Sequence, residues 1–122
     1  MDKQNDSKDP EAVFKQMIKT GSVNEDSVLD AIAVQDRQLA ILCIARMAKA
    51  PKAAVEKIIA LNAAKPIIAV CWKAGLSMRT CLRIQQEIAQ VPSKDLIYPR
   101  GGFDYPLEEA EIKWQLQFLD LV

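Results

Sequence analysis

Residues 67–84, IIAVCWKAGLSMRTCLRI, are the stretch of sequence that decides the fold. Its first half has the pattern of a short apolar helix, and its second half carries Arg79 and Arg83 at helical spacing. Between them, Gly75 and Ser77 are typical of a helix end and a helix start, which predicts a tight helix–turn–helix corner. Such a corner suits either a DNA-reading element or a buried turn in a protein-binding module.

Helix caps divide the rest of the chain into similar short units. Asp9-Pro10 opens a helix that Gly21 ends, and further starts fall at Asn24, Asp36, Pro51 and Pro66. The run LAILCIA after Asp36 is apolar on every side, which predicts the most buried helix of the domain. No stretch alternates as a strand does. We therefore expect a single all-α domain over residues 1–122, with antiparallel hairpins stacked as a small HEAT-like α-solenoid or bundle.

Four parts are expected along the chain. They are a disordered tail at 1–8, a helical core at 9–91, an extended segment at 92–106 and a C-terminal helix at 107–122 that packs back on the core. The extended segment is rich in proline and glycine, and four apolar side chains are expected to anchor it. These are Ile97, Tyr98, Phe103 and Tyr105.

Charge is unevenly distributed although the chain is neutral overall. Residues 1–36 hold four lysines and eight acids, and residues 84–122 hold three basic residues and seven acids. Residues 37–83 hold nine basic residues and Glu56 as their only acid. The basic middle can attract nucleic acid or an acidic protein. The alternative is that the acidic ends fold over it and neutralise it.

The sequence offers little chemistry for a catalytic or metal site. It contains no histidine, no phosphate-binding glycine loop and no paired-cysteine motif. Cys43, Cys71 and Cys81 lie in helical patterns and are expected to be reduced and buried. Apolar runs are too short for a membrane span, and the N-terminus lacks a signal sequence. We expect a non-enzymatic, cytoplasmic protein with no cofactor, metal or small-molecule substrate.

The corner resembles the helix-turn-helix motif of bacterial repressors over residues 70–84, with Cys71 as its small residue and Gly75 at its turn. The resemblance implies polar side chains that point toward DNA. Met78 and Leu82 depart from it, because both fall on the face that would read bases. The candidate partner or nucleic-acid surface comprises Lys73, Ser77, Arg79, Thr80, Arg83 and Gln86.

Two apolar stripes run along the C-terminal helix. Leu107, Ala110, Trp114, Phe118 and Leu121 form one stripe, and Ile112, Leu116 and Leu119 form the other. A terminal helix with two apolar faces is either clamped between elements or presents one face to a partner. The candidate protein interface is the second stripe.

The segments ARMAKAPKAAVEKI, CWKAGLSMRT and WQLQFL together resemble the C-terminal part of a family of uncharacterised alphaproteobacterial proteins, a domain of unknown function, over about residues 28–121. The resemblance implies HEAT-like helical hairpins in a bacterial cytoplasm and supplies no catalytic residues. The leading hypothesis is a helical-repeat module that binds a protein, either an acidic partner or a second copy. The alternative is a DNA-binding regulator that uses residues 67–86.

Overall fold

The computed structural model describes residues 9–102 and 104–121. Within these residues the chain is helical and has no strand, which confirms the predicted all-α class. The α-helices are α1 (Pro10–Thr20), α2 (Glu25–Ala33), α3 (Arg37–Ala48), α4 (Lys52–Ala60), α5 (Ala64–Ala74), α6 (Met78–Arg83) and α7 (Glu109–Phe118). The tail at 1–8 lies outside the described residues.

Side-chain caps mark the starts of α1, α2, α3 and α6, whereas α5 starts at Ala64 and not at the predicted Pro66. The Asp9, Asn24, Asp36 and Ser77 side chains each accept a hydrogen bond from a backbone N–H in the first turn of their helix. Gly21 and Gly75 end α1 and α5 in the left-handed conformation, with φ of 66° and 79°. A side chain is strained at these φ values, which explains glycine at both positions. The predicted starts of α1, α2, α3 and α6 are therefore confirmed.

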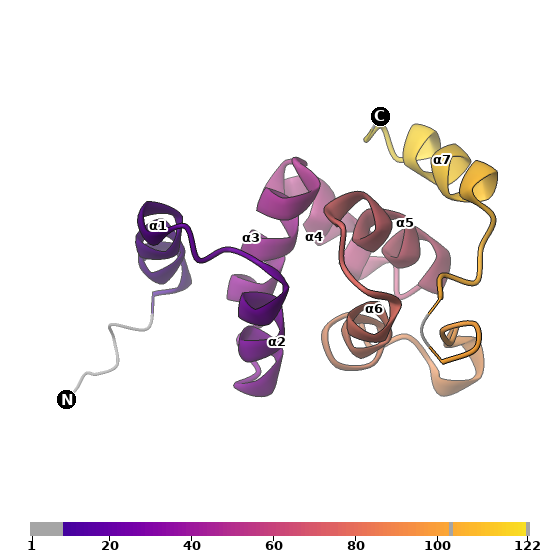
Figure 1. Ribbon diagram of the computed structural model, residues 1–122, viewed down its shortest axis with the longest axis horizontal. Helices are drawn as coiled ribbons and strands as arrows, with labels where there is room; N and C mark the ends of the chain where they lie inside the picture. Colours follow the sequence, from indigo (N-terminus) through magenta and orange to yellow (C-terminus); the bar gives the residue numbers. More distant parts are fainter. Residues whose placement is uncertain (1–8, 103, 122) are drawn as a thin grey trace.

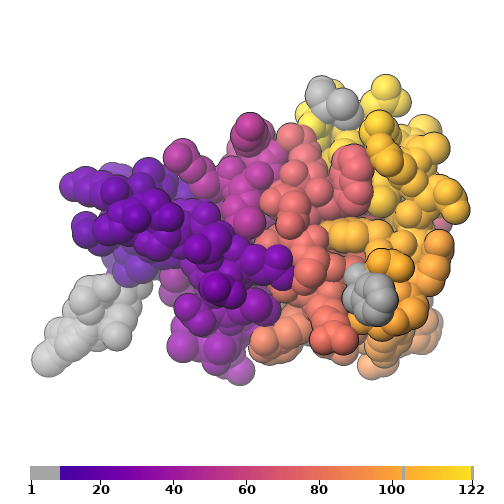
Figure 2. Space-filling view, viewed as in Figure 1, coloured from indigo at the N-terminus to yellow at the C-terminus, as the bar shows by residue number. Residues whose placement is uncertain are grey.

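The odd-numbered helices form a row. Contacts run from α1 to α3, from α3 to α5 and from α5 to α7, so the N-terminal and C-terminal helices lie at opposite ends (Figure 1). The space-filling view shows the same separation, with indigo α1 at one end and the yellow C-terminal residues at the other (Figure 2). Elongation by successive helix contacts is typical of stacked helical hairpins.

The remaining helices flank this row. α2 packs on α3 and also contacts α6, while α4 packs on α3 and α5 and lies behind them in Figure 1. In a regular stack of hairpins, α2 would pack on α4 and α4 on α6. Here α2 instead contacts α6 directly, so the N-terminal part of the chain packs on the helix–turn–helix corner.

Helices α3 and α5 supply most of the core. All six residues from Ala40 to Ala45 are buried, as the apolar run predicted. α5 is buried to a similar extent, with Ile67 to Cys71 all at 1% exposure or less. The two helices therefore share the role that the sequence assigned to α3 alone.

The sixth helix differs from its prediction as one continuous helix to about Gln90. After Arg83 the backbone widens into a π-helical turn, Ile84–Ile88. The Ala89 N–H donates to the Ile84 carbonyl at 2.8 Å. Asn62 and Arg37 donate from their side chains to the carbonyls of Ala89 (2.6 Å) and Ile88 (2.5 Å). These long-range bonds satisfy carbonyls that a helix end leaves free.

The segment after this turn is tied to the core at two points. Gln85 is fully buried; its side-chain oxygen accepts from the Ile97 N–H and its amide donates to the Ile97 carbonyl, both at 3.0 Å. The Tyr105 hydroxyl donates to the Leu76 carbonyl at 2.7 Å. Two of the four expected anchors are therefore seen. Tyr98 was wrongly predicted as an anchor, since it is 57% exposed, and Phe103 lies outside the described residues.

Candidate protein interface

The helix–turn–helix corner is present, but its second helix is held from within the chain. The Glu25 carboxylate, at the first turn of α2, accepts hydrogen bonds from the Ser77 N–H (3.2 Å) and hydroxyl (2.6 Å). It also accepts one from the Thr80 hydroxyl. The N-terminal turn of α6 is where a DNA-reading corner meets phosphates. Here an acidic side chain of the same molecule occupies that place.

These bonds change the acidity of Glu25. Partial burial raises its pKa, while hydrogen bonds from Ser77 and Thr80 lower it and outweigh the burial. The net result is a pKa below the usual value, so the carboxylate is ionised at neutral pH. The link between α2 and α6 is therefore a charge-assisted one.

Three of the other predicted surface residues also have partners within the molecule. Arg79 donates from Nε to the Gly102 carbonyl at 3.0 Å, and Arg83 pairs with Glu87 at 3.0 Å. Lys73 donates to the Ala48 carbonyl at 2.7 Å, whereas Gln86 is exposed on the π-helical turn. The six residues are therefore not gathered into one open, outward-facing row. The C-terminal segment reaches across the corner at Arg79.

Met78 lies in the core and not on the surface. The sequence placed it on the DNA-reading face, but its side chain has 0% exposure. α6 spans only Met78–Arg83, and α2 packs directly against it, so its first residue points inward. That prediction was wrong.

Acidic residues from both ends of the chain pair with the basic middle. Glu11 in α1 pairs with Lys52 at 3.2 Å, and Glu111 in α7 pairs with Lys65 at 2.8 Å. Both pairs are partly exposed, so each stabilises the fold only slightly. They favour the alternative in which the acidic ends partly neutralise the middle.

The three cysteines are free thiols in the core, as the sequence predicted. Burial raises the pKa of Cys43 to about 11. A hydrogen bond with the Cys81 thiol, together with burial, raises the pKa of Cys71. Burial likewise raises the pKa of Tyr105. Protonated, inaccessible thiols are poor nucleophiles.

The C-terminal helix turns its predicted interface inward. Ile112 and Leu116 are 1% and 3% exposed, because this stripe packs on α5, and Leu119 is half-buried. Ile112 and Leu116 are therefore core residues and not an open interface. The other stripe is divided, because Leu121 is 8% exposed and packs in the core whereas Trp114 and Phe118 are exposed.

The outer face of α7 carries an exposed aromatic pair. Trp114 is 57% exposed and Phe118 is 75% exposed. Their rings stack with centroids 5.6 Å apart and an interplanar angle of 13°. Large apolar groups grouped on a surface are typical of interaction sites. Periodicity identified both stripes, but it could not show which one packs on α5.

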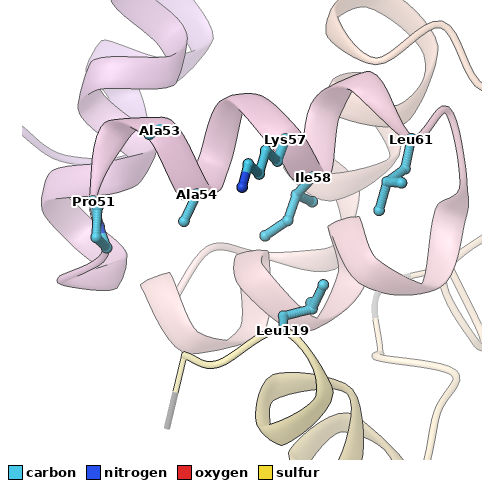
Figure 3. A pocket seen from close by; sticks show the side chains of 7 residues that line it. All are labelled: Pro51, Ala53, Ala54, Lys57, Ile58, Leu61 and Leu119. Atoms are coloured by element: carbon cyan, nitrogen blue, oxygen red, sulfur yellow. The ribbon is translucent and has the colours of Figure 1, made fainter.

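Two open hollows lie at the C-terminal part of the chain, one beside α7 and one at Leu119, just after that helix. One, of about 610 Å³, lies between α5 and α7; it is lined by Trp72, Lys73, Ala110, Lys113, Trp114, Leu116, Gln117 and Leu121. The other, of about 430 Å³, lies between α4 and Leu119, and its α4 wall comprises Pro51, Ala53, Ala54, Lys57, Ile58 and Leu61. Figure 3 shows Lys57 and Ile58 extending from α4 on the side of Leu119. The hollows are lined in part by residues of the two predicted surfaces, namely Lys73, Leu116 and Leu119.

Comparison with known families identifies the family of this chain. Residues 1–100 match the model of a family described as an uncharacterised protein conserved in bacteria (DUF2336). The chain belongs to this family. The match contains α1 to α6, so α7 lies beyond its last matched residue. No curated protein and no solved structure matches this DUF2336 chain. Among its described residues, no helix has the length and apolar character of a membrane span.

Proposed function

We propose that this DUF2336 protein is a non-enzymatic, HEAT-like helical-repeat module of the bacterial cytoplasm that binds another protein at α7. The observation that carries the proposal is the stacked, exposed pair Trp114 and Phe118 beside two open hollows. The row of helices from α1 to α7 supports it, because stacked hairpins commonly present extended binding surfaces.

The energetics support an interface of this kind. Aromatic side chains bury about 150–250 Å² each, and apolar burial contributes about 25 cal/mol per Å². Covering the exposed parts of Trp114 and Phe118 would contribute on the order of 5 kcal/mol before the cost of association. A few aromatic anchors of this size commonly dominate a protein interface.

The experiment compares the wild-type chain with a Trp114→Ser, Phe118→Ser variant. Both serve as baits, and quantitative mass spectrometry measures which proteins lose enrichment; sedimentation velocity measures self-association. Val34→Ser is the control, because Val34 is 73% exposed at the C-cap of α2, far along the chain from α7. The proposal expects a specific partner, or self-association, that is lost in the double variant and retained in the control. An identical partner profile for all three proteins contradicts it.

The DNA-binding alternative has no supporting observation of comparable weight. Ser77 and Thr80 donate to Glu25, and Arg79 donates to Gly102. These contacts direct the polar groups of α6 toward the molecule itself. The protein-binding role is therefore the one we propose.

A further inference from the structure

The hollow between α5 and α7 carries the same two side-chain types on both helices. α5 contributes Trp72 and Lys73, and α7 contributes Lys113 and Trp114. The chain has two tryptophans, so both of them line this space. Tryptophan rings and lysine stems are apolar, whereas each lysine ends in a cation. We call this space, with these four side chains, the α5–α7 hollow.

The remaining lining of the α5–α7 hollow is apolar or uncharged. Leu116 and Leu121 are 3% and 8% exposed, and Ala110 and Gln117 complete the lining. None of the described residues that line the hollow is acidic. Its volume of about 610 Å³ lies within the range of about 300–1,000 Å³ that is usual for ligand sites. A bound group therefore meets both apolar surface and positive charge.

Both lysines retain hydrogen-bond donors for a ligand. Lys73 donates from Nζ to the Ala48 carbonyl at 2.7 Å, and an ammonium group has three N–H donors. Lys113 pairs with Glu109 at 2.9 Å, but the two side chains are 60% and 64% exposed. Exposed pairs of this spacing stabilise a helix only slightly. A ligand carboxylate can therefore share Lys113 with Glu109 or take the place of Glu109.

The α5–α7 hollow is continuous with the exposed aromatic pair. Trp114 lines the hollow and also stacks on Phe118. A protein that covers the pair therefore reaches the hollow while α7 keeps its packed position. Because the hollow is open to solvent, a polypeptide can pass across it and place one side chain inside.

We propose that the α5–α7 hollow binds an acidic, apolar segment of the partner protein. The proposal rests on the protein-binding function proposed above and names the chemistry of the partner. An apolar side chain of that segment lies between Trp72 and Trp114, and carboxylates on either side of it accept hydrogen bonds from Lys73 and Lys113. α7 stays packed on α5 throughout.

Charge and apolar surface together select this class of partner. A basic segment would place its cations beside Lys73 and Lys113, and like charges in one site repel. A segment without an apolar residue would leave the tryptophan rings and the buried leucines beneath it uncovered. An apolar anchor in a pocket with charged groups around it is a common arrangement in protein interfaces.

The probe is the peptide SDLES, acetylated and amidated at its ends, titrated into the full chain and followed by tryptophan fluorescence. Because both tryptophans line the hollow, their emission reports its occupation. We expect saturable binding with a Kd on the order of 1 mM or tighter. The uncharged peptide SNLQS should bind at least about tenfold more weakly, and SDSES, which lacks the leucine, should also bind more weakly. Absence of binding, or equal binding of the charged and uncharged peptides, overturns the proposal.

The two members of one exposed ion pair should change binding in opposite directions. Lys113→Met removes a charge and keeps an apolar side chain, so it should weaken the acidic peptide severalfold and leave the uncharged peptide unchanged. Glu109→Gln removes the carboxylate that competes for Lys113, so it should tighten the acidic peptide. Lys19→Met is the matched control, because Lys19 is an exposed lysine of α1, at the opposite end of the molecule (Figure 1). Weaker or unchanged binding in Glu109→Gln, or equal effects of Lys19→Met and Lys113→Met, contradicts the proposal.

Trp72 distinguishes the hollow from the outer face of α7. In Trp114→Phe, Trp72 is the only tryptophan, and its emission should still change as the peptide binds. A response that disappears with Trp114 places the peptide on the outer aromatic pair and overturns the proposal. Decanoate, another apolar carboxylate, is titrated in parallel. Tighter binding of decanoate than of the peptide, with the same dependence on Lys113, makes a fatty acid the occupant and overturns the assignment to a protein segment.

The two proposals fail separately. Phe118 does not line the α5–α7 hollow, so Phe118→Ser should leave peptide binding unchanged. Peptide binding in the hollow, with no partner lost from the Trp114→Ser, Phe118→Ser bait, rejects the outer-face interface alone. A partner that is lost from that bait but fully retained by Lys113→Met rejects the acidic segment alone.

Discussion

The carboxylate of Glu25 accepts two hydrogen bonds from Ser77, one from the backbone N–H at 3.2 Å and one from the hydroxyl at 2.6 Å. The two residues are 52 positions apart and begin α2 and α6 respectively. Ser77 also caps its own helix through the Thr80 N–H at 3.3 Å. A single exposed serine thus joins the N-terminal part of the chain to the helix–turn–helix corner.

This link predicts an acid-dependent loss of stability. A carboxyl group whose pKa is lowered by folding contributes stability above its unfolded-state pKa, about 4.3 for glutamate. The contribution is lost as the pH falls through the lower folded-state pKa. Glu25→Gln should therefore be less stable than wild type at neutral pH, and the difference should shrink in acid. Denaturant unfolding across pH measures it, and a difference that is constant or grows in acid contradicts the prediction.

Gln85 should matter far more to stability than its neighbour Gln86. Gln85 is fully buried and satisfies both backbone groups of Ile97, whereas Gln86 is exposed. Unpaired polar groups in an interior cost about 1–3 kcal/mol. We expect Gln85→Ala to lower the free energy of unfolding by about that amount, and Gln86→Ala to change it by no more than about 0.5 kcal/mol. Urea denaturation of the two variants gives the comparison; similar losses would contradict the role assigned to Gln85.

The thiols should be unreactive in the folded protein. Cys43, Cys71 and Cys81 are buried, and burial holds the pKa of Cys43 at about 11. Reaction with a disulfide reagent then requires local or global opening of the fold. We expect modification at least on the order of 100-fold slower than in denaturant. Rapid labelling of any one cysteine under native conditions would place that thiol at the surface.

Local signals in the sequence predicted the helices well. Asp9, Asn24, Asp36 and Ser77 cap helices through bonds within one turn, so their effect can be read from neighbouring residues. A continuous apolar run likewise predicted the burial of residues 40–45. The π-helical turn at Ile84–Ile88 escaped prediction because it depends on Arg37 and Asn62, which are distant in sequence.

The candidate site was harder to predict for the same reason. In the sequence, Glu25 is recognisable only as an acidic residue at the start of a helix. No neighbouring residue indicates that it accepts hydrogen bonds from Ser77 and Thr80. Two stripes on α7 have similar apolar character, so only the packing on α5 separates Ile112 from Trp114. Periodicity identifies faces, whereas tertiary contacts decide which face is buried.

The two faces of α7 should respond differently to truncation. Ile112 is 1% exposed and Phe118 is 75% exposed. Removing a buried isoleucine costs about 2–5 kcal/mol, whereas surface changes usually cost less than about 0.5 kcal/mol. Ile112→Ala should therefore speed hydrogen exchange throughout α7, and Phe118→Ala should leave it nearly unchanged. Greater loss of protection in Phe118→Ala would show that the aromatic face is the packed one.

The corner at residues 67–86 should not bind DNA. Glu25 places a negative charge at the start of α6, Met78 is buried, and Arg79 and Arg83 are engaged with Gly102 and Glu87. Phosphate contacts strengthen steeply as salt is lowered, so any capacity of the two arginines to bind DNA would appear first at low salt. We expect no retardation of a mixed-sequence duplex at low salt, and the same result for an Arg79→Ala, Arg83→Ala variant. A shift that weakens with added salt and disappears in the double variant would instead restore the DNA-reading interpretation, because that pattern requires both arginines to face phosphates.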